Sequence, residues 1–148
     1  MDKRMQGLLI ANGALVLLAG FAAGFPYASA VGAALDPSAQ ANAAEALRAW
    51  HMAHLEGVLN GLLILASAAA VAHLTLSMTA QRVVFWGLVA AGWTNVVASS
   101  ISAITGGRGM APTGFDWNTL DFTLFMIGVA GAIAAMVTLA VAGLRTPR

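Results

Sequence analysis

The sequence predicts an all-α integral membrane protein, a four-transmembrane-helix bundle in which residues 1–148 form a single domain. The chain is 59% hydrophobic and only 9% charged, whereas a soluble domain usually carries about 25% charged residues. Four apolar segments approach the roughly 20 residues that span a bilayer. No ladder of alternating residues is present, which disfavours a membrane β-barrel.

Each expected helix follows from one of these apolar segments. The first covers about 6–35 and contains Pro26 near its outer end, and the second covers about 43–76. The third covers about 81–104 and the fourth about 119–144. Gly and Ala are abundant in all four segments, and such small residues let membrane helices approach closely.

The positive charges predict the orientation of the bundle. With four spans both termini share one side, together with the loop near residues 77–82, and this side collects Lys3, Arg4, Arg82, Arg145 and Arg148. The other side holds only Arg48 and Arg108. Because positive residues gather on the cytoplasmic side, we expect cytoplasmic termini in a bacterial-type inner membrane. The first apolar run is longer than the core of a secretory signal, so we expect it to remain as a span.

Several function classes are excluded or unsupported at this stage. The chain has no Cys, which rules out disulfides and thiolate metal sites. Its net charge is +1 without a basic run, so the sequence gives no support for nucleic-acid binding.

Three histidines are the candidate metal ligands, and helix geometry separates them. His54 and His73 lie about 28 Å apart along one helix, so they cannot share an iron within one chain. His51 and His54 are neighbours, but no carboxylate shares their stripe. A single-His site remains, and one axial His leaves the sixth iron position of a haem open for binding or chemistry. The alternative is a His54 that only hydrogen-bonds a neighbouring helix.

The second helix carries polar groups on two faces. At about 100° per residue, His54 shares a face with Gly57 and Gly61, whereas Asn60 lies about 120° away, together with Glu56. The two glycines would leave a flat strip for a large planar ligand, or else would serve close helix packing. The two faces indicate that one helix contributes to two sites. In an oligomer, one face would give a ligand to one site and the other face would line the neighbouring site.

The third helix and the outer loop add further candidates. Ala91, Asn95 and Ser99 fall on one stripe, and Asn95 at membrane depth needs a partner, for which an interhelical hydrogen bond is favoured. Arg108 in the outer loop can pair with an anionic group such as a haem propionate, although Asp116 or a lipid phosphate would serve as well.

These residues together resemble a known family. The pattern W-x-x-A-H-x5-N-G, followed by G-W-x-N and R-G, resembles styrene oxide isomerase; it is formed here by Trp50, Ala53, His54, Asn60, Gly61, Gly92, Trp93, Asn95, Arg108 and Gly109. The shared register runs without gaps from about residue 5 to residue 108. The resemblance therefore covers most of the chain.

The resemblance implies a homotrimer of four-helix subunits, with haem b between subunits and His54 as the iron ligand. Gly57, Gly61 and Arg108 would help to bind this cofactor. The family's catalytic Asn matches Asn60, which would bind and orient the epoxide oxygen from the subunit opposite the haem ligand. Asn95 and Ser99 are the further candidate catalytic residues.

The resemblance also implies a redox-neutral reaction. Ferric haem acts as a Lewis acid on a hydrophobic aryl epoxide, the benzylic C–O bond opens, and a 1,2-hydride shift gives an aldehyde. A dry site in the membrane bundle keeps water from trapping the cation.

Two positions depart from the family pattern. The family's helix-3 Asp corresponds to Ala91 and its catalytic Tyr to Ser99, while the only tyrosine here, Tyr27, is expected to lie elsewhere. The smaller residues suggest a substrate larger than styrene oxide. Two alternatives stay open: a non-enzymatic haem-binding membrane protein, such as a sensor or carrier, and a structural subunit without cofactor. The sequence assigns no role to His51, Glu56 or His73.

Overall fold

The computed structural model describes residues 1–36, 38 and 43–145, and this part of the chain folds into four long α-helices. They are α1 (Lys3–Leu35), α2 (Ala43–Ala70), α3 (Met78–Thr105) and α4 (Trp117–Arg145), with a 3₁₀ turn, η1 (Val71–His73), after α2. Each α-helix is long and apolar enough to cross a membrane. The predicted all-α class with four spans is therefore confirmed.

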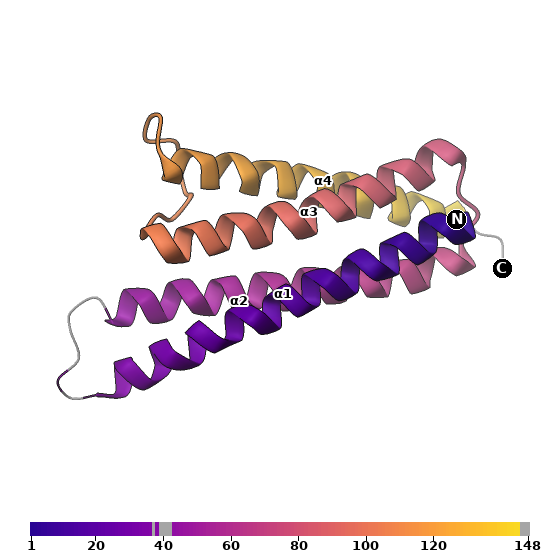
Figure 1. Ribbon diagram of the computed structural model, residues 1–148. Coiled ribbons are helices and arrows are strands. Elements are labelled where there is room, and N and C mark those ends of the chain that lie inside the picture. The colour runs from indigo at the N-terminus through magenta and orange to yellow at the C-terminus, as the bar shows by residue number, and fades with distance from the viewer. Residues whose placement is uncertain (37, 39–42, 146–148) are drawn as a thin grey trace.

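Successive helices run in opposite directions, so the beginning of α1 and the end of α4 lie at the same end of the bundle (Figure 1). This agrees with the expected even number of spans. That this end faces the cytoplasm stays a prediction from the charge distribution.

The end of the second span and the start of the third differ from the sequence expectation. The second span was expected to reach residue 76, but α2 ends at Ala70 and η1 ends at His73. The third helix begins at Met78 because Ser77 caps it: the Ser77 hydroxyl oxygen accepts a hydrogen bond from the Ala80 backbone N–H at 3.3 Å. A serine in this role satisfies one of the free N–H groups of the first turn. Pro26 lies inside α1 and does not end it.

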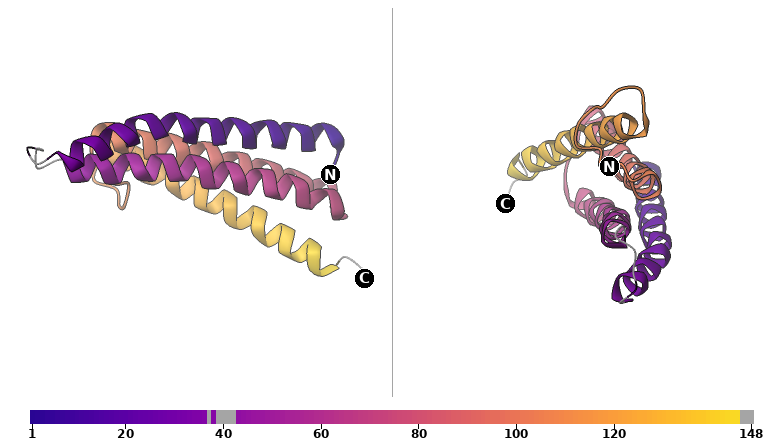
Figure 2. Two further views of the ribbon diagram at one scale, coloured as in Figure 1. Left: turned by 90° about the horizontal axis from the view of Figure 1, so that it is seen from below. Right: turned by 90° about the vertical axis from the view of Figure 1, so that its left-hand side faces the viewer.

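The helices form two pairs, α1 with α2 and α3 with α4, and α3 also packs against both members of the first pair. Leu9, Val16, Ile64, Val84 and Leu88 fill the centre of the bundle and are fully buried. Figure 2 shows α4 on the outside of the bundle, beside α3 and away from α1.

Helix α4 buries only a narrow stripe against α3. The stripe consists of Asp121, Gly128 and Ala135, at intervals of seven residues. The rest of α4 is largely exposed, and its exposed large hydrophobic residues include Met126, Ile133 and Val137. In a membrane this apolar surface contacts lipid or another subunit.

Candidate functional site

His54 lies on the side of α2 that faces α1, and its ring is held by the α1 backbone. Its Nδ1 atom is 2.8 Å from the carbonyl oxygen of Gly20. A carbonyl oxygen only accepts hydrogen bonds, so Nδ1 carries the proton and Nε2 keeps its lone pair. A metal-ligating histidine usually has this arrangement, in which the second ring nitrogen donates to a carbonyl or carboxylate. The donor chemistry of His54 therefore fits an axial iron ligand.

The close approach of α1 to His54 depends on small residues. A methyl group at Gly24 would lie 3.2 Å from His54 Nδ1, and one at Gly20 would lie 2.5 Å from the Val58 backbone nitrogen. Glycine at these two positions lets the α1 backbone reach the histidine ring. The sequence of α1 thus positions a residue of α2.

Tyr27 joins this face of α2, contrary to the expectation that it would lie elsewhere. Its ring stacks on His51, with centroids 5.0 Å apart, and on His54, with centroids 5.8 Å apart. The sequence reasoning missed this contact because it depends on the register of α1 against α2. The only signal was the pair of glycines Gly20 and Gly57. If they face each other in an antiparallel helix pair, residue 27, seven positions after Gly20, lies beside residue 50, seven positions before Gly57.

Gly57 and Gly61 serve close helix packing, and the expected open strip for a planar ligand is not found. A methyl group at Gly57 would lie 2.5 Å from the Gly20 backbone nitrogen, and one at Gly61 would lie 2.6 Å from the Leu17 nitrogen. Helix α1 therefore covers both glycines. The packing alternative accounts for them, because backbone atoms can meet this closely only where no side chain intervenes.

A different side of α2 carries the second polar group, as the angular spacing predicted. The Asn60 Nδ2 atom donates to the backbone carbonyl of Glu56 at 2.8 Å and to its Oε2 atom at 2.7 Å. Asn95 Nδ2 on α3 donates to Asn60 Oδ1 at 3.5 Å. Glu56, to which the sequence assigned no role, is thus the main partner of Asn60.

The α3 candidates divide into an interhelical contact and an internal one. Asn95 makes the interhelical hydrogen bond that was favoured, while its buried Oδ1 lacks a hydrogen-bond partner among the described residues and lies against Gly128 of α4. The Ser99 hydroxyl donates to the Asn95 backbone carbonyl at 2.8 Å, within α3. Ala91 and Ser99 are both buried inside the bundle.

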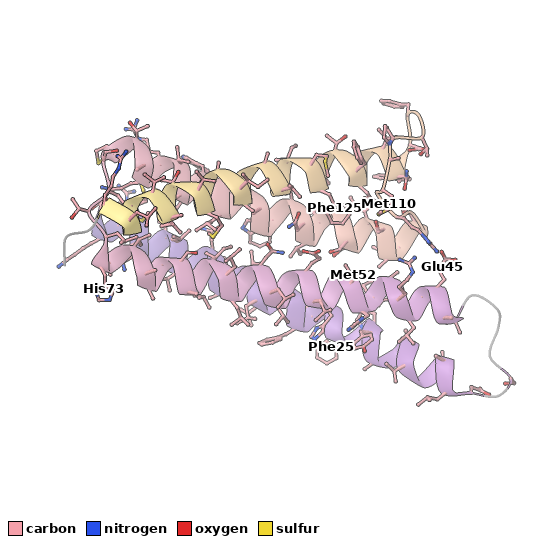
Figure 3. The ribbon with its side chains drawn as sticks, turned by 180° about the vertical axis from the view of Figure 1, so that it is seen from behind. Phe25, Glu45, Met52, His73, Met110 and Phe125 are labelled. Atoms are coloured by element: carbon pink, nitrogen blue, oxygen red, sulfur yellow. The ribbon has the colours of Figure 1, made fainter. Side chains whose placement is uncertain are left out.

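Arg108 lies at the end of the bundle opposite the termini and does not join His54 in this structure. Its guanidinium is 3.7 Å from the Glu45 carboxylate, and both side chains are exposed. Glu45 precedes His54 by nine residues, or about 13 Å along α2. In Figure 3, Glu45 lies near the start of α2 and His73 lies at the other end of the molecule.

A further buried carboxylate was missed by the sequence reasoning. Asp121 is fully buried, its Oδ2 accepts a hydrogen bond from the Ser102 hydroxyl at 2.7 Å, and its Oδ1 lacks a partner in the described part of the chain. The loop after α3 packs over it through Gly107 and Gly109. Asp121 therefore ties α3, α4 and this loop together.

The protein ligands available at His54 limit the kind of metal that it can hold. Within residues 1–36, 38 and 43–145, no three His, Asp or Glu side chains come close enough to bind a metal ion. A metal at His54 must therefore bring most of its own ligands, as the iron of a haem does. The residues present fit such a group through one axial bond.

Fold and site together define a class: a four-helix membrane protein in which one helix presents a fixed histidine on one face and, on another face, a buried amide hydrogen-bonded to a partly buried carboxylate. The chain belongs to the styrene oxide isomerase family, whose model matches residues 5–144. The family name implies an isomerase. A comparison with curated proteins finds no match.

Proposed function

We propose that the protein is a membrane isomerase that converts aryl epoxides to aldehydes without net redox change, with haem b held by His54. Family membership supports the isomerase class. The observation that carries the cofactor assignment is the hydrogen bond from His54 Nδ1 to the Gly20 carbonyl at 2.8 Å. It fixes the ring and leaves the Nε2 lone pair for a metal, which supports the proposal.

The cofactor and the chain supply different parts of the chemistry. Ferric haem, when bound, supplies a Lewis acid for the epoxide oxygen. The helices supply an apolar surrounding that keeps water away from the opened epoxide, and water would otherwise convert it to a diol. Asn60 supplies a polar group near the reacting atoms, held in place by Glu56 and Asn95.

We also propose that the protein assembles as a homotrimer, with haem between subunits. His54 and Asn60 lie on different faces of α2 and are hydrogen-bonded to α1 and to α3 respectively. One chain therefore offers a ligand to one site and a polar group to another, which a ring of copies would complete. The exposed apolar surface of α4 supplies a face for lipid or for the neighbouring copy. The proposed location is a bacterial-type inner membrane with cytoplasmic termini.

The substrate is proposed to be a hydrophobic aryl epoxide, bulkier than styrene oxide. The support is the pair of small residues, Ala91 and Ser99, where the family pattern has Asp and Tyr. The same departures favour a second candidate function, a haem-binding sensor or carrier without turnover. Because the Ser99 hydroxyl bonds within α3, Ser99 does not replace a tyrosine hydroxyl in the rearrangement.

The test is an absorption spectrum of the detergent-purified protein, followed by aldehyde assays with styrene oxide and a bulkier aryl epoxide. We expect a haem absorption band and aldehyde formation, and His54→Ala should abolish both. His51→Ala is the matched control, since His51 lies one turn away, also stacks on Tyr27 and is exposed. A haem band without turnover supports the sensor or carrier. Turnover in His54→Ala contradicts the assignment of the ligand.

A further inference from the structure

The orientation of the Asn60 amide is set by Glu56. Both acceptors that meet Asn60 Nδ2, at 2.8 and 2.7 Å, belong to Glu56: its backbone carbonyl and its Oε2. A backbone carbonyl cannot donate a hydrogen bond, so only the NH₂ group of Asn60 can face it. The two N–H bonds of Asn60 are therefore both engaged, and the amide oxygen points away from Glu56 toward α3.

The Asn60 oxygen is the only part of this amide that can act on a ligand. Oδ1 receives one long contact, 3.5 Å from Asn95 Nδ2, and an amide oxygen has room for a second donor or a positive charge. Asn60 is 9% exposed, so its amide is shielded from solvent. A shielded dipole acts more strongly on nearby charge than one in water.

We propose that Glu56 is a positioning residue that presents Asn60 Oδ1 as an electron-rich group toward the substrate, an inference that rests on the proposed epoxide isomerisation. In that reaction the benzylic C–O bond breaks and its electron pair stays on oxygen. A hydride then moves from the adjacent carbon to the benzylic carbon, while the C=O bond forms, so no proton or electron is gained or lost.

The role of Asn60 follows from the charge that develops during ring opening. Positive charge grows at the benzylic carbon, and the negative end of a fixed amide dipole stabilises it. The sequence had suggested that Asn60 binds the epoxide oxygen. An amide whose two N–H bonds are held by Glu56 does not donate to that oxygen.

Moving the carboxylate to residue 60 and the amide to residue 56 tests whether Asn60 acts through its oxygen and Glu56 by positioning it. The variants are Glu56→Gln, Asn60→Asp and the double variant, in which the Gln amide donates to the new carboxylate. Asn60→Asp alone sets two carboxylates side by side and should lower kcat about tenfold or more, with a lower melting temperature. The double variant keeps an oxygen acceptor at residue 60 and should recover the part of kcat and of the melting temperature lost to the carboxylate pair, but not the part lost with the hydrogen bond to the Glu56 backbone carbonyl, with KM little changed.

Asn12→Asp is the matched control for placing a carboxylate in a membrane helix. Asn12 Nδ2 also donates to a carbonyl of its own helix, that of Leu8, at 2.9 Å, and its Oδ1 accepts from Trp93 at 3.0 Å. Glu56→Gln should not rescue Asn12→Asp. Rescue there would mean that Glu56 acts on overall stability and would overturn the positioning role.

The remaining outcomes separate this inference from the proposed function. If the wild-type protein makes aldehyde but the folded double variant is as slow as Asn60→Asp, the acceptor role of Asn60 fails and the isomerase stands. If the wild-type protein makes no aldehyde, the proposed function fails and the positioning role of Glu56 in that reaction fails with it. Recovery of the melting temperature in the double variant then supports only the fixed amide orientation.

Discussion

Replacing Gly20 with alanine should destabilise the protein, because the change forces α1 and α2 apart. The new methyl carbon would lie 2.5 Å from the Val58 backbone nitrogen and 2.6 Å from the Gly57 carbonyl carbon. Both are backbone atoms, so no side chain can rotate away. Ordinary contacts begin near 3.4 Å, so the helices must separate locally by about 3.4 − 2.5 = 0.9 Å.

The same separation would weaken the hold on His54. The distance from His54 Nδ1 to the Gly20 oxygen is now 2.8 Å, and an added displacement on the order of 0.9 Å takes it beyond hydrogen-bond range. Overpacking costs about 1–3 kcal/mol, and the lost hydrogen bond costs about 1 kcal/mol. For a chain of this size the melting temperature should fall on the order of 10 °C.

The assay is thermal unfolding of the purified protein in detergent, with Gly7→Ala as the matched control. Gly7 is also in α1, and a methyl group there would meet nothing within 4 Å. Gly7→Ala should melt at or slightly above the wild-type temperature, because alanine favours a helix over glycine. If Gly20→Ala and Gly7→Ala have the same melting temperature, the close backbone contact between α1 and α2 does not stabilise the fold around His54.

Two further predictions concern the end of the bundle opposite the termini. Ser102→Ala removes the 2.7 Å hydrogen bond to the buried Asp121 and should lower the unfolding free energy by about 1–3 kcal/mol. Ser100→Ala is the control, because the Ser100 hydroxyl bonds within α3. Equal melting temperatures of the two variants would contradict the role of the Ser102–Asp121 bond. The pKa of Asp116 is lowered chiefly by the hydrogen bond from the Thr119 backbone N–H. A lowered pKa stabilises the fold above the unfolded-state value, near 3.8, and this stabilisation is lost as the pH falls through the folded-state pKa. The melting difference between wild type and Asp116→Ala should therefore shrink on acidification below pH 4, and a constant difference would exclude an ionised Asp116 as its source.

Much of the fold could be predicted because its determinants are local. Apolar length fixed the four spans, since a backbone in lipid must satisfy its hydrogen bonds within a helix. The helical repeat predicted that His54 and Asn60 lie on different faces of α2. In the structure His54 is hydrogen-bonded to α1 and Asn60 to α3. The N-terminal cap at Ser77 moved the start of α3 only by a few residues.

The contacts between helices could not be predicted in the same way, because they depend on which segments meet and in what register. No local pattern in the sequence gives that register. Only the tertiary structure decided that α1 covers Gly57 and Gly61 and that Tyr27 stacks on His54. It also decided that Arg108 pairs with Glu45, near the start of α2. The sequence by itself determined the membrane class, the helices and the two faces of α2, because hydrophobicity and helical periodicity are properties of single segments. The partners of each face are set by contacts between segments far apart in the chain, where close packing of glycines chooses one register.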